Sequence, residues 1–433
     1  MCARPVPLIA ALAFASACGT GGQGPRDTVA AQHEVAAAAN EWNHARTENG
    51  LPFGPVSQEQ ILRGRALVIH HACGGGCHGA AARGQNPAAE GWLTGTRSPD
   101  QEFLIGACTE EAPDAEPCFR TRPRNLTADH LTGLGRFSER QIFNALRFGL
   151  RPGETPDVEI TSTTPGVGNF PEYPKYLAIP MPWPAWRHME DRELWDIVAY
   201  LKHGLRAVRH QVEDSEGPPD FWASEYTVEK IGSYPAPPFP TAHETTPPEG
   251  RLQQVLRGRK LVLDHACSAC HGGVWTPGQE GWLVGARTPD LVFRVDGLRV
   301  LPRNLTPHPT LGTGRYTERQ IFNALRFGLR PGETPDVEIT SSTPGEGNFP
   351  EKPRYLSLAM PWVAWRHMPD EDLWAIAAYL KHGVRPVAQD VPESEMPPDF
   401  WASRVTPERI GPHPSPPFPT ANETVGLQTS QRR

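Results

Sequence analysis

The chain has 433 residues, with 42 lysines and arginines against 49 aspartates and glutamates and a formal net charge of -7. This length exceeds that of one small domain, so two or three domains are expected. No block of basic residues interrupts the acidic balance, and the composition therefore gives no indication of a nucleic-acid partner. The 48 prolines predict long loops and short helices.

Residues 1–18 resemble an export signal. They carry one positive charge, Arg4, followed by an apolar stretch that is too short to span a membrane. The string Ala15-Ser16-Ala17-Cys18 is similar to a bacterial lipoprotein cleavage box, in which Cys18 becomes the lipidated first residue; an ordinary signal cleaved near Ala17 is the alternative. Residues 19–52 are then expected to be a linker. No later segment is typical of a membrane span, so a lipid would be the only anchor of a periplasmic or cell-envelope protein.

The rest of the chain is an internal repeat. Residues Glu139–Ser162 recur without a change as Glu318–Ser341. Repeats of this length indicate duplicated structural units. We therefore expect two tandem domains, residues 53–247 and 248–433.

Three helices are predicted in each repeat. In the first repeat they are expected at Gln58–His71, from Ser138 onward, and at Asp191–His203. The first two begin with Ser followed three residues later by Gln, which is typical of a capped helix start. Apolar residues at three- and four-residue steps predict one buried face in each helix.

Two cysteine strings carry the clearest chemistry. In Cys267-Ser268-Ala269-Cys270-His271 two thiols three positions apart can bond both vinyl groups of one haem, and the next histidine can bind the iron. The earlier string Cys73-Gly74-Gly75-Gly76-Cys77-His78 has one extra residue, which glycines can accommodate in a bulge. A chance pattern or a redox dithiol is the alternative for the string at Cys267–His271. A disulfide or an empty relic is the alternative for the earlier string.

The second iron ligand in each repeat is predicted to be a methionine. Met181 and Met360 each precede a proline in a loop before the last helix. A thioether is a soft ligand, and a His/Met pair raises the reduction potential of haem iron. Core packing is the alternative for both. Met189 and Met368 are expected to be hydrophobic staples of the last helix.

The neighbours of these ligands also repeat. A carbonyl of Pro123-Arg124-Asn125-Leu126, or of its copy beginning at Pro302, is expected to hold the second ring nitrogen of each haem histidine. Either Trp186 or Arg187, and their copies Trp365 and Arg366, can reach a haem propionate; a core Trp and a solvated Arg are the alternative. Five further histidines are expected to be structural or surface groups: His70, His71, His188, His265 and His367.

Two cysteines remain outside the strings. Cys108 and Cys118 lie in a polar segment that the second repeat lacks. In an oxidising compartment they are expected to form a disulfide, with two free thiols as the alternative.

The repeats resemble the class I c-type cytochrome domain, and the whole chain is similar to a tandem di-haem cytochrome c. The resemblance rests on the haem strings after a helix, the Pro-x-Asn-Leu segments, the Met-Pro loops and a last helix containing Ala-Tyr-Leu-Lys. It covers residues 53–210 and 248–389. It implies a mainly α fold, with short helices and Pro/Gly-rich loops around covalent haem. It also implies that the first and last helices cross at Gly64 with Tyr200, and at Gly258 with Tyr379.

The resemblance implies an electron carrier with two covalent haem c groups and no catalytic residue. Its Met-Pro-Trp spacing is similar to that of cytochrome subunits that accept electrons from quinoprotein dehydrogenases, so redox proteins are the expected partners. The alternative is a peroxidase-like enzyme in which one iron keeps an open position.

Overall fold

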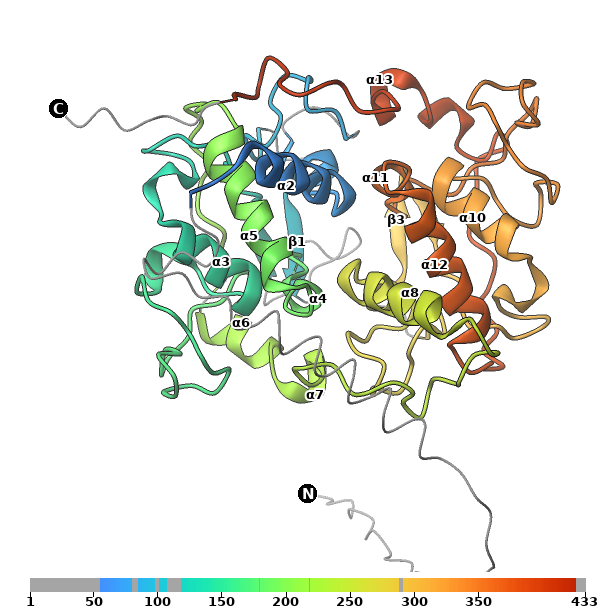
Figure 1. Cartoon of the computed structure of the whole chain (residues 1–433), viewed down its shortest axis with the longest axis horizontal. Coiled ribbons are helices and arrows are strands. Elements are labelled where there is room, and N and C mark those ends of the chain that lie inside the picture. Colours follow the sequence, from blue (N-terminus) through green and yellow to red (C-terminus); the bar gives the residue numbers. More distant parts are fainter. Residues whose placement is uncertain are drawn as a thin grey trace, which may run out of the picture. The chain divides into compact units, whose positions relative to one another are not determined.

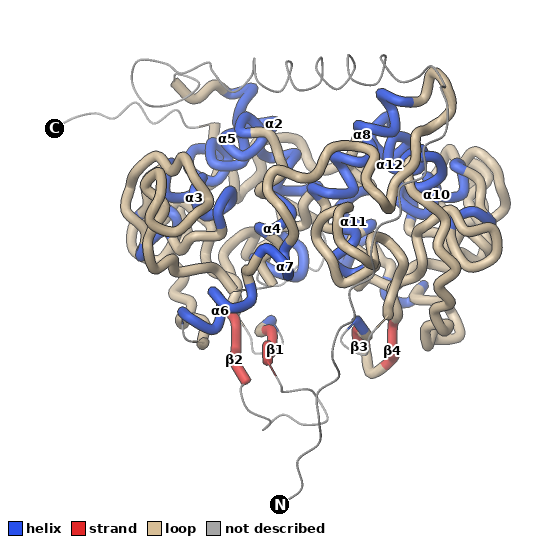
Figure 2. The backbone as a smooth tube through the Cα atoms, turned by 90° about the horizontal axis from the view of Figure 1, so that it is seen from below, coloured by secondary structure: helices blue, strands red, loops and turns tan. Residues whose placement is uncertain are grey.

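Helices and loops dominate the part of the chain that the computed structural model describes, which comprises residues 55–79, 85–97, 101–106, 118–178, 180–217, 219–287 and 291–425 (Figures 1 and 2). Within these ranges the strands form two short antiparallel hairpins, β1–β2 and β3–β4. The predicted mainly α class is confirmed. The signal segment with Cys18, the linker 19–52 and Cys108 lie outside the described residues. Cys118 is the first residue of β2. Because its expected partner Cys108 is not among the described residues, the Cys108–Cys118 disulfide stays a prediction.

The elements of the first half are α2 (Gln58–His70), η1 (Gly74–His78), β1 (Phe103–Gly106), β2 (Cys118–Thr121), η3 (Leu134–Arg136), α3 (Glu139–Phe148), η4 (Pro152–Glu154), α4 (Trp183–Trp186), α5 (Asp191–Ala199), η5 (Tyr200–Gly204), α6 (Pro219–Glu225) and α7 (Val228–Ile231). Those of the second half are α8 (Leu252–Asp264), α9 (Cys267–Cys270), β3 (Phe293–Val295), β4 (Leu298–Val300), η7 (Thr313–Arg315), α10 (Glu318–Phe327), α11 (Trp362–Trp365), α12 (Asp370–His382), η8 (Ala402–Arg404) and α13 (Pro407–Ile410). No helix in the described part of the chain combines the length and the apolar character needed to cross a membrane.

The capping signals place the helix starts correctly. The hydroxyl of Ser57 accepts the backbone N–H of Gln60 at the start of α2. Ser138 and Gln141 satisfy each other's backbone N–H groups at the start of α3, and α10 is capped in the same way. The third predicted helix differs in its last turn, because Tyr200–Gly204 is wound as a π-helix, whereas the copy in α12 stays α-helical to His382.

The first and last helices of each half cross where the resemblance implied, as α2 with α5 and α8 with α12 (Figure 1). A Cβ atom on Gly64 would collide with the carbonyl oxygen of Asp196 and lie 3.0 Å from Cβ of Tyr200. At the second crossing a Cβ atom on Gly258 would collide with the backbone of α12 and lie 2.8 Å from Cβ of Tyr379. Both positions therefore need a residue without a side chain, because the backbone of the facing helix cannot move aside.

Each half has its own hydrophobic core, built around its crossing helices. Trp92, Leu194 and Tyr200 are fully buried in the first core, and Trp282, Leu373 and Tyr379 take equivalent places in the second. The indole N–H of Trp92 donates to the hydroxyl of Tyr200 at 3.1 Å, and that of Trp282 donates to Tyr379 at 2.9 Å.

The buried glutamate that binds the arginine and tyrosine of each half comes from the tail of the other half. Glu423, near the end of the chain, accepts bonds from Arg65 and Tyr200 in the first half. Glu244, in the tail of the first repeat, accepts the equivalent bonds from Arg259 and Tyr379. Both carboxylates are 0 % exposed. The two repeats thus exchange the ends of their tails, an arrangement that the repeat boundaries alone do not reveal.

Candidate functional site

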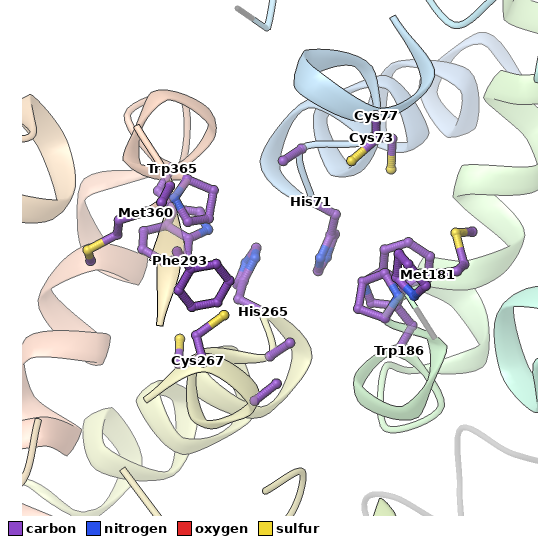
Figure 3. Close-up of a pocket in the computed structure, with 18 of the residues that line it drawn as sticks. His71, Cys73, Cys77, Met181, Trp186, His265, Cys267, Phe293, Met360 and Trp365 are labelled. Atoms are coloured by element: carbon purple, nitrogen blue, oxygen red, sulfur yellow. The ribbon is translucent and has the colours of Figure 1, made fainter. Parts of the chain in front are cut away.

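One cavity of about 1140 Å³ collects the residues singled out in the sequence (Figure 3). Its walls come from both halves and include both cysteine pairs, His78, His271, Met181 and Met360. Small-molecule and cofactor sites usually enclose about 300–1,000 Å³, so this volume lies above the range for a single site. The walls between these groups are mostly apolar, including Ile142, Leu146, Ile321 and Leu325 at equivalent places.

The histidine after each cysteine pair is held in one orientation by a backbone carbonyl. Nδ1 of His78 lies 2.7 Å from the carbonyl oxygen of Arg124, and Nδ1 of His271 lies 2.7 Å from that of Arg303. A carbonyl can only accept, so Nδ1 carries the proton and Nε2 keeps a free lone pair. Burial lowers the pKa of both imidazoles, for His78 to about 4, which keeps them neutral. These carbonyls belong to the Pro-Arg-Asn-Leu segments, as expected.

Buried asparagines hold those segments in place. The side-chain amide of Asn125 donates to the carbonyls of Val208 and His210, while its oxygen accepts the N–H of Thr127. Asn304 makes the corresponding bonds in the second half. The segment whose carbonyl orients each histidine is therefore fixed by an asparagine side chain that bonds backbone carbonyls more than 80 residues away along the chain.

The extra residue of the first cysteine string is absorbed by a π-helical turn. The N–H of His78 bonds the carbonyl of Cys73 at 3.0 Å across five residues, whereas the N–H of His271 bonds the carbonyl of Cys267 at 2.9 Å across four. A π-turn is an α-turn with one residue inserted, so both histidines end on the carbonyl of the first cysteine. A side chain at Gly74 would collide with the ring of Trp92, which explains one glycine of the string. The predicted bulge therefore takes this helical form.

The four thiols are free and lie in apolar surroundings. Burial raises the pKa of Cys73 and Cys267 to about 12, and that of Cys77 and Cys270 to about 11. Reactive dithiols in redox motifs show the opposite shift, because nearby positive charge or a helix N-terminus lowers their pKa. The surroundings therefore argue against a redox dithiol at either string.

The methionines separate into two kinds. Met181 and Met360 are half-buried and line the cavity. Met189 and Met368 are 2 % and 3 % exposed in the two hydrophobic cores and are not among the described residues of the cavity wall. The geometry is thus compatible with the predicted division between ligands and packing residues, although the iron ligation itself remains a prediction.

Arginines at equivalent positions add positive charge to the cavity wall. Arg136 and Arg151 line it in the first half, and their copies Arg315 and Arg330 line it in the second. These arginines were not predicted as site residues, although their recurrence in both repeats was a signal in the sequence. A guanidinium matches the geometry of a carboxylate, so these side chains can hold an acidic substituent of a cofactor.

The structure places Arg187 neither in solvent nor on the cavity wall, where it could reach a haem propionate. Its guanidinium is buried and donates to the carbonyls of Ile231 and Gly232, and Arg366 donates likewise to Ile410 and Gly411. These arginines anchor the tail segments and are neither solvated nor part of the described cavity wall. The adjacent Trp186 and Trp365 do line the cavity.

Two histidines expected to be structural or surface groups meet at the centre of the cavity. The rings of His71 and His265 stack with centroids 4.3 Å apart and planes 17° apart. Burial lowers the pKa of His265 to about 3 and that of His71 well below its usual range, so both rings are neutral. Figure 3 shows the two rings facing each other between the cysteine pairs.

These residues fit a covalently attached haem in each half. Each half presents two free thiols, a neutral imidazole with Nε2 available, a thioether and arginines to one apolar cavity. This donor set is the one that c-type haem attachment and His/Met ligation require.

Three of the relatives found by comparison with known proteins are of one kind. The chain is 29% identical over 155 residues to the fructose dehydrogenase cytochrome subunit of Gluconobacter japonicus. The aligned region covers 36% of this chain and 26% of the relative. It is 31% identical over 142 residues to the cytochrome c subunit of a quinone alcohol dehydrogenase of Gluconacetobacter polyoxogenes, covering 33% of this chain and 24% of the relative.

A longer alignment joins the chain to the gluconate 2-dehydrogenase cytochrome c subunit of Pantoea cypripedii, with 25% identity over 292 residues, covering 64% of this chain and 55% of the relative. No family model matches the chain. The chain thus spans about a quarter of the length of the first two curated relatives and about half of the third. All three are cytochrome subunits of dehydrogenases, which supports the resemblance to cytochrome c.

Proposed function

We propose that this protein is a di-haem c-type cytochrome that transfers single electrons between redox proteins. One haem is attached to Cys73 and Cys77 and bound by His78 and Met181. The other is attached to Cys267 and Cys270 and bound by His271 and Met360. Residues 53–247 and 248–433 are the two cytochrome domains, which exchange the ends of their tails.

The observation that carries this proposal is the matched pair of imidazoles. Each of His78 and His271 has its Nδ1 bound to a carbonyl at 2.7 Å, beside two free thiols in an apolar cavity. Carbonyl-bound Nδ1 is the arrangement that fixes the tautomer and ring orientation of a metal-binding histidine. The same arrangement in both halves supports two sites rather than one.

The chain's own residues favour electron transfer over catalysis. Bound haem would supply an iron that changes between the ferrous and ferric states. The protein holds the imidazole through the Arg124 or Arg303 carbonyl, offers a thioether on the same cavity, and excludes water with apolar walls. An iron held by both an imidazole and a thioether would rearrange little on reduction. The peroxidase alternative needs an open iron, and Met181 and Met360 on the cavity wall do not favour it.

The relatives support a partner of the dehydrogenase class. We propose that the protein accepts electrons from a dehydrogenase and passes them to a second redox protein. It would work in the periplasm or cell envelope, anchored by a lipid on Cys18, with the Cys108–Cys118 disulfide formed in that oxidising compartment.

Haem stoichiometry tests the proposal. The protein, produced in a host that attaches haem c, is expected to give two haems per chain by alkaline pyridine spectrum. The variants Cys77→Ala and Cys270→Ala, which disrupt one string each, are expected to lose covalent attachment at that string alone, as shown by peptide mass after digestion. One haem in the unaltered chain would remove the first site. A colourless protein would refute the proposal as a whole.

A further inference from the structure

Each of the two cysteine strings begins against the other half of the chain. Ala72 and Ala266 each precede the first cysteine of a string, and both adopt left-handed backbone angles, with φ of 58° and 55°. Ala72 packs against the hydrophobic core of the second half, and Ala266 packs against that of the first. Left-handed angles are uncommon outside glycine and asparagine. In both halves the same left-handed turn therefore follows the helix and places the cysteine string where the two halves meet.

A chain of aromatic rings crosses that contact. His71 and His265 stack at its centre, and the ring of each lies edge-on to the tryptophan of its own half, with centroids 6.1 Å apart for Trp186 and 6.0 Å for Trp365. All four rings line the cavity that holds both cysteine pairs. Figure 3 shows Trp186 beside Met181 and Trp365 near Met360, with the histidine pair between them.

Further contacts hold the histidine pair in place. Nε2 of His70, next to His71, bonds the carbonyl of His367 across the contact at 3.0 Å. Lys260 of α8 pairs with Glu193 of α5 at 2.7 Å and also binds Asp264, next to His265. Nδ1 of His71 is buried and has no hydrogen-bond partner among the described residues, so the contacts of this ring that the structure shows are ring contacts with His265 and Trp186.

We propose that the stacked pair His71–His265 is the contact through which the two haem sites exchange electrons. The proposal rests on the di-haem function proposed above and adds the route between the sites. The exchange moves one electron from the ferrous iron of one site to the ferric iron of the other. No proton moves, and the imidazoles are neither oxidised nor reduced in the net step. Their role would be to place packed rings, rather than water, in the part of the cavity between the two cysteine pairs.

The test compares ring removal with ring replacement. The holoprotein, half-reduced, is examined by two-dimensional exchange NMR, which follows electron exchange between the haems through their methyl resonances. The double variant His71→Ala/His265→Ala is expected to slow this exchange by about tenfold or more, equivalent to about 1.4 kcal/mol in activation free energy. The double variant His71→Phe/His265→Phe, which keeps two rings, is expected to retain most of the rate.

A matched control variant removes an aromatic ring that is stacked outside the described cavity wall. Phe143 stacks on Trp195 with centroids 4.6 Å apart and is not among the described residues of the cavity wall. Phe143→Ala is expected to lower stability without slowing exchange. Reduction potentials and the dipolar broadening between the two ferric haems in EPR spectra are recorded for every variant, because a purely structural change would alter these.

Each outcome decides the proposal. Slower exchange in the alanine variant, with unchanged dipolar broadening and potentials, supports it. Equal rates in the alanine and control variants overturn it, as does equal slowing in the phenylalanine and alanine variants. Slowing together with lost dipolar broadening also overturns it, because the slower exchange would then come from a greater distance between the two haems. A haem count below two defeats the di-haem function itself and is recognised by the pyridine spectrum.

Discussion

Replacing Glu423 by glutamine tests the tail exchange directly. Its carboxylate accepts bonds from Arg65 Nε at 2.6 Å, Arg65 Nη2 at 3.2 Å and the Tyr200 hydroxyl at 2.6 Å, and it is 0 % exposed. Glutamine keeps the size of the side chain but leaves the buried guanidinium of Arg65 without a counter-charge. Breaking a buried ion pair on one side costs about 3–5 kcal/mol. We expect E423Q to lower the free energy of unfolding by this amount.

Urea unfolding of the holoprotein, followed by tryptophan fluorescence, measures the effect. Glu244→Gln is expected to cost a similar amount, since Arg259 and Tyr379 bind Glu244 with nearly the same distances. Glu59→Gln is the control, because Glu59 pairs with Arg63 on the surface and such pairs contribute about 0.2–1 kcal/mol. A loss of less than about 1 kcal/mol for Glu423→Gln, as for a surface pair, would refute the reasoning.

Three further results are expected. Met181→His should remove part of the weak far-red absorption typical of methionine bound to ferric iron, whereas Met189→Leu should leave it intact; the opposite result would reverse the ligand assignment. Gly258→Ala should destabilise the protein by about 1–3 kcal/mol in urea, because the added methyl group collides with the backbone of the last helix; unchanged stability would show that the helices can separate. The hydrogen bond from His203 lowers the pKa of Glu139. The stability from this bond is therefore present above the usual glutamate pKa and is lost as pH falls through the lowered value. Glu139→Gln should accordingly flatten the acid limb of stability against pH, and an unchanged acid limb would exclude this contribution.

Local patterns were sufficient for the elements that depend on neighbouring residues. The capped starts of α2 and α3 followed from Ser with Gln three residues later. The contacts of Gly64 and Gly258 with the last helices followed from the resemblance of the repeats to cytochrome c domains. The π-turn at Gly74–His78 was anticipated only as a bulge, because the sequence shows an extra residue but not the hydrogen bond that absorbs it.

By itself, the sequence determined the duplication, the two cysteine-histidine strings and the candidate methionines, because each is a pattern of residue types within a short stretch or its exact copy. Tertiary structure alone decided that Glu244 and Glu423 complete the opposite cores, and that His71 and His265 stack in one shared cavity. These contacts join residues more than 100 positions apart. Nothing in the composition of either partner specifies such a pairing; it depends on where the folded halves place their tails and strings.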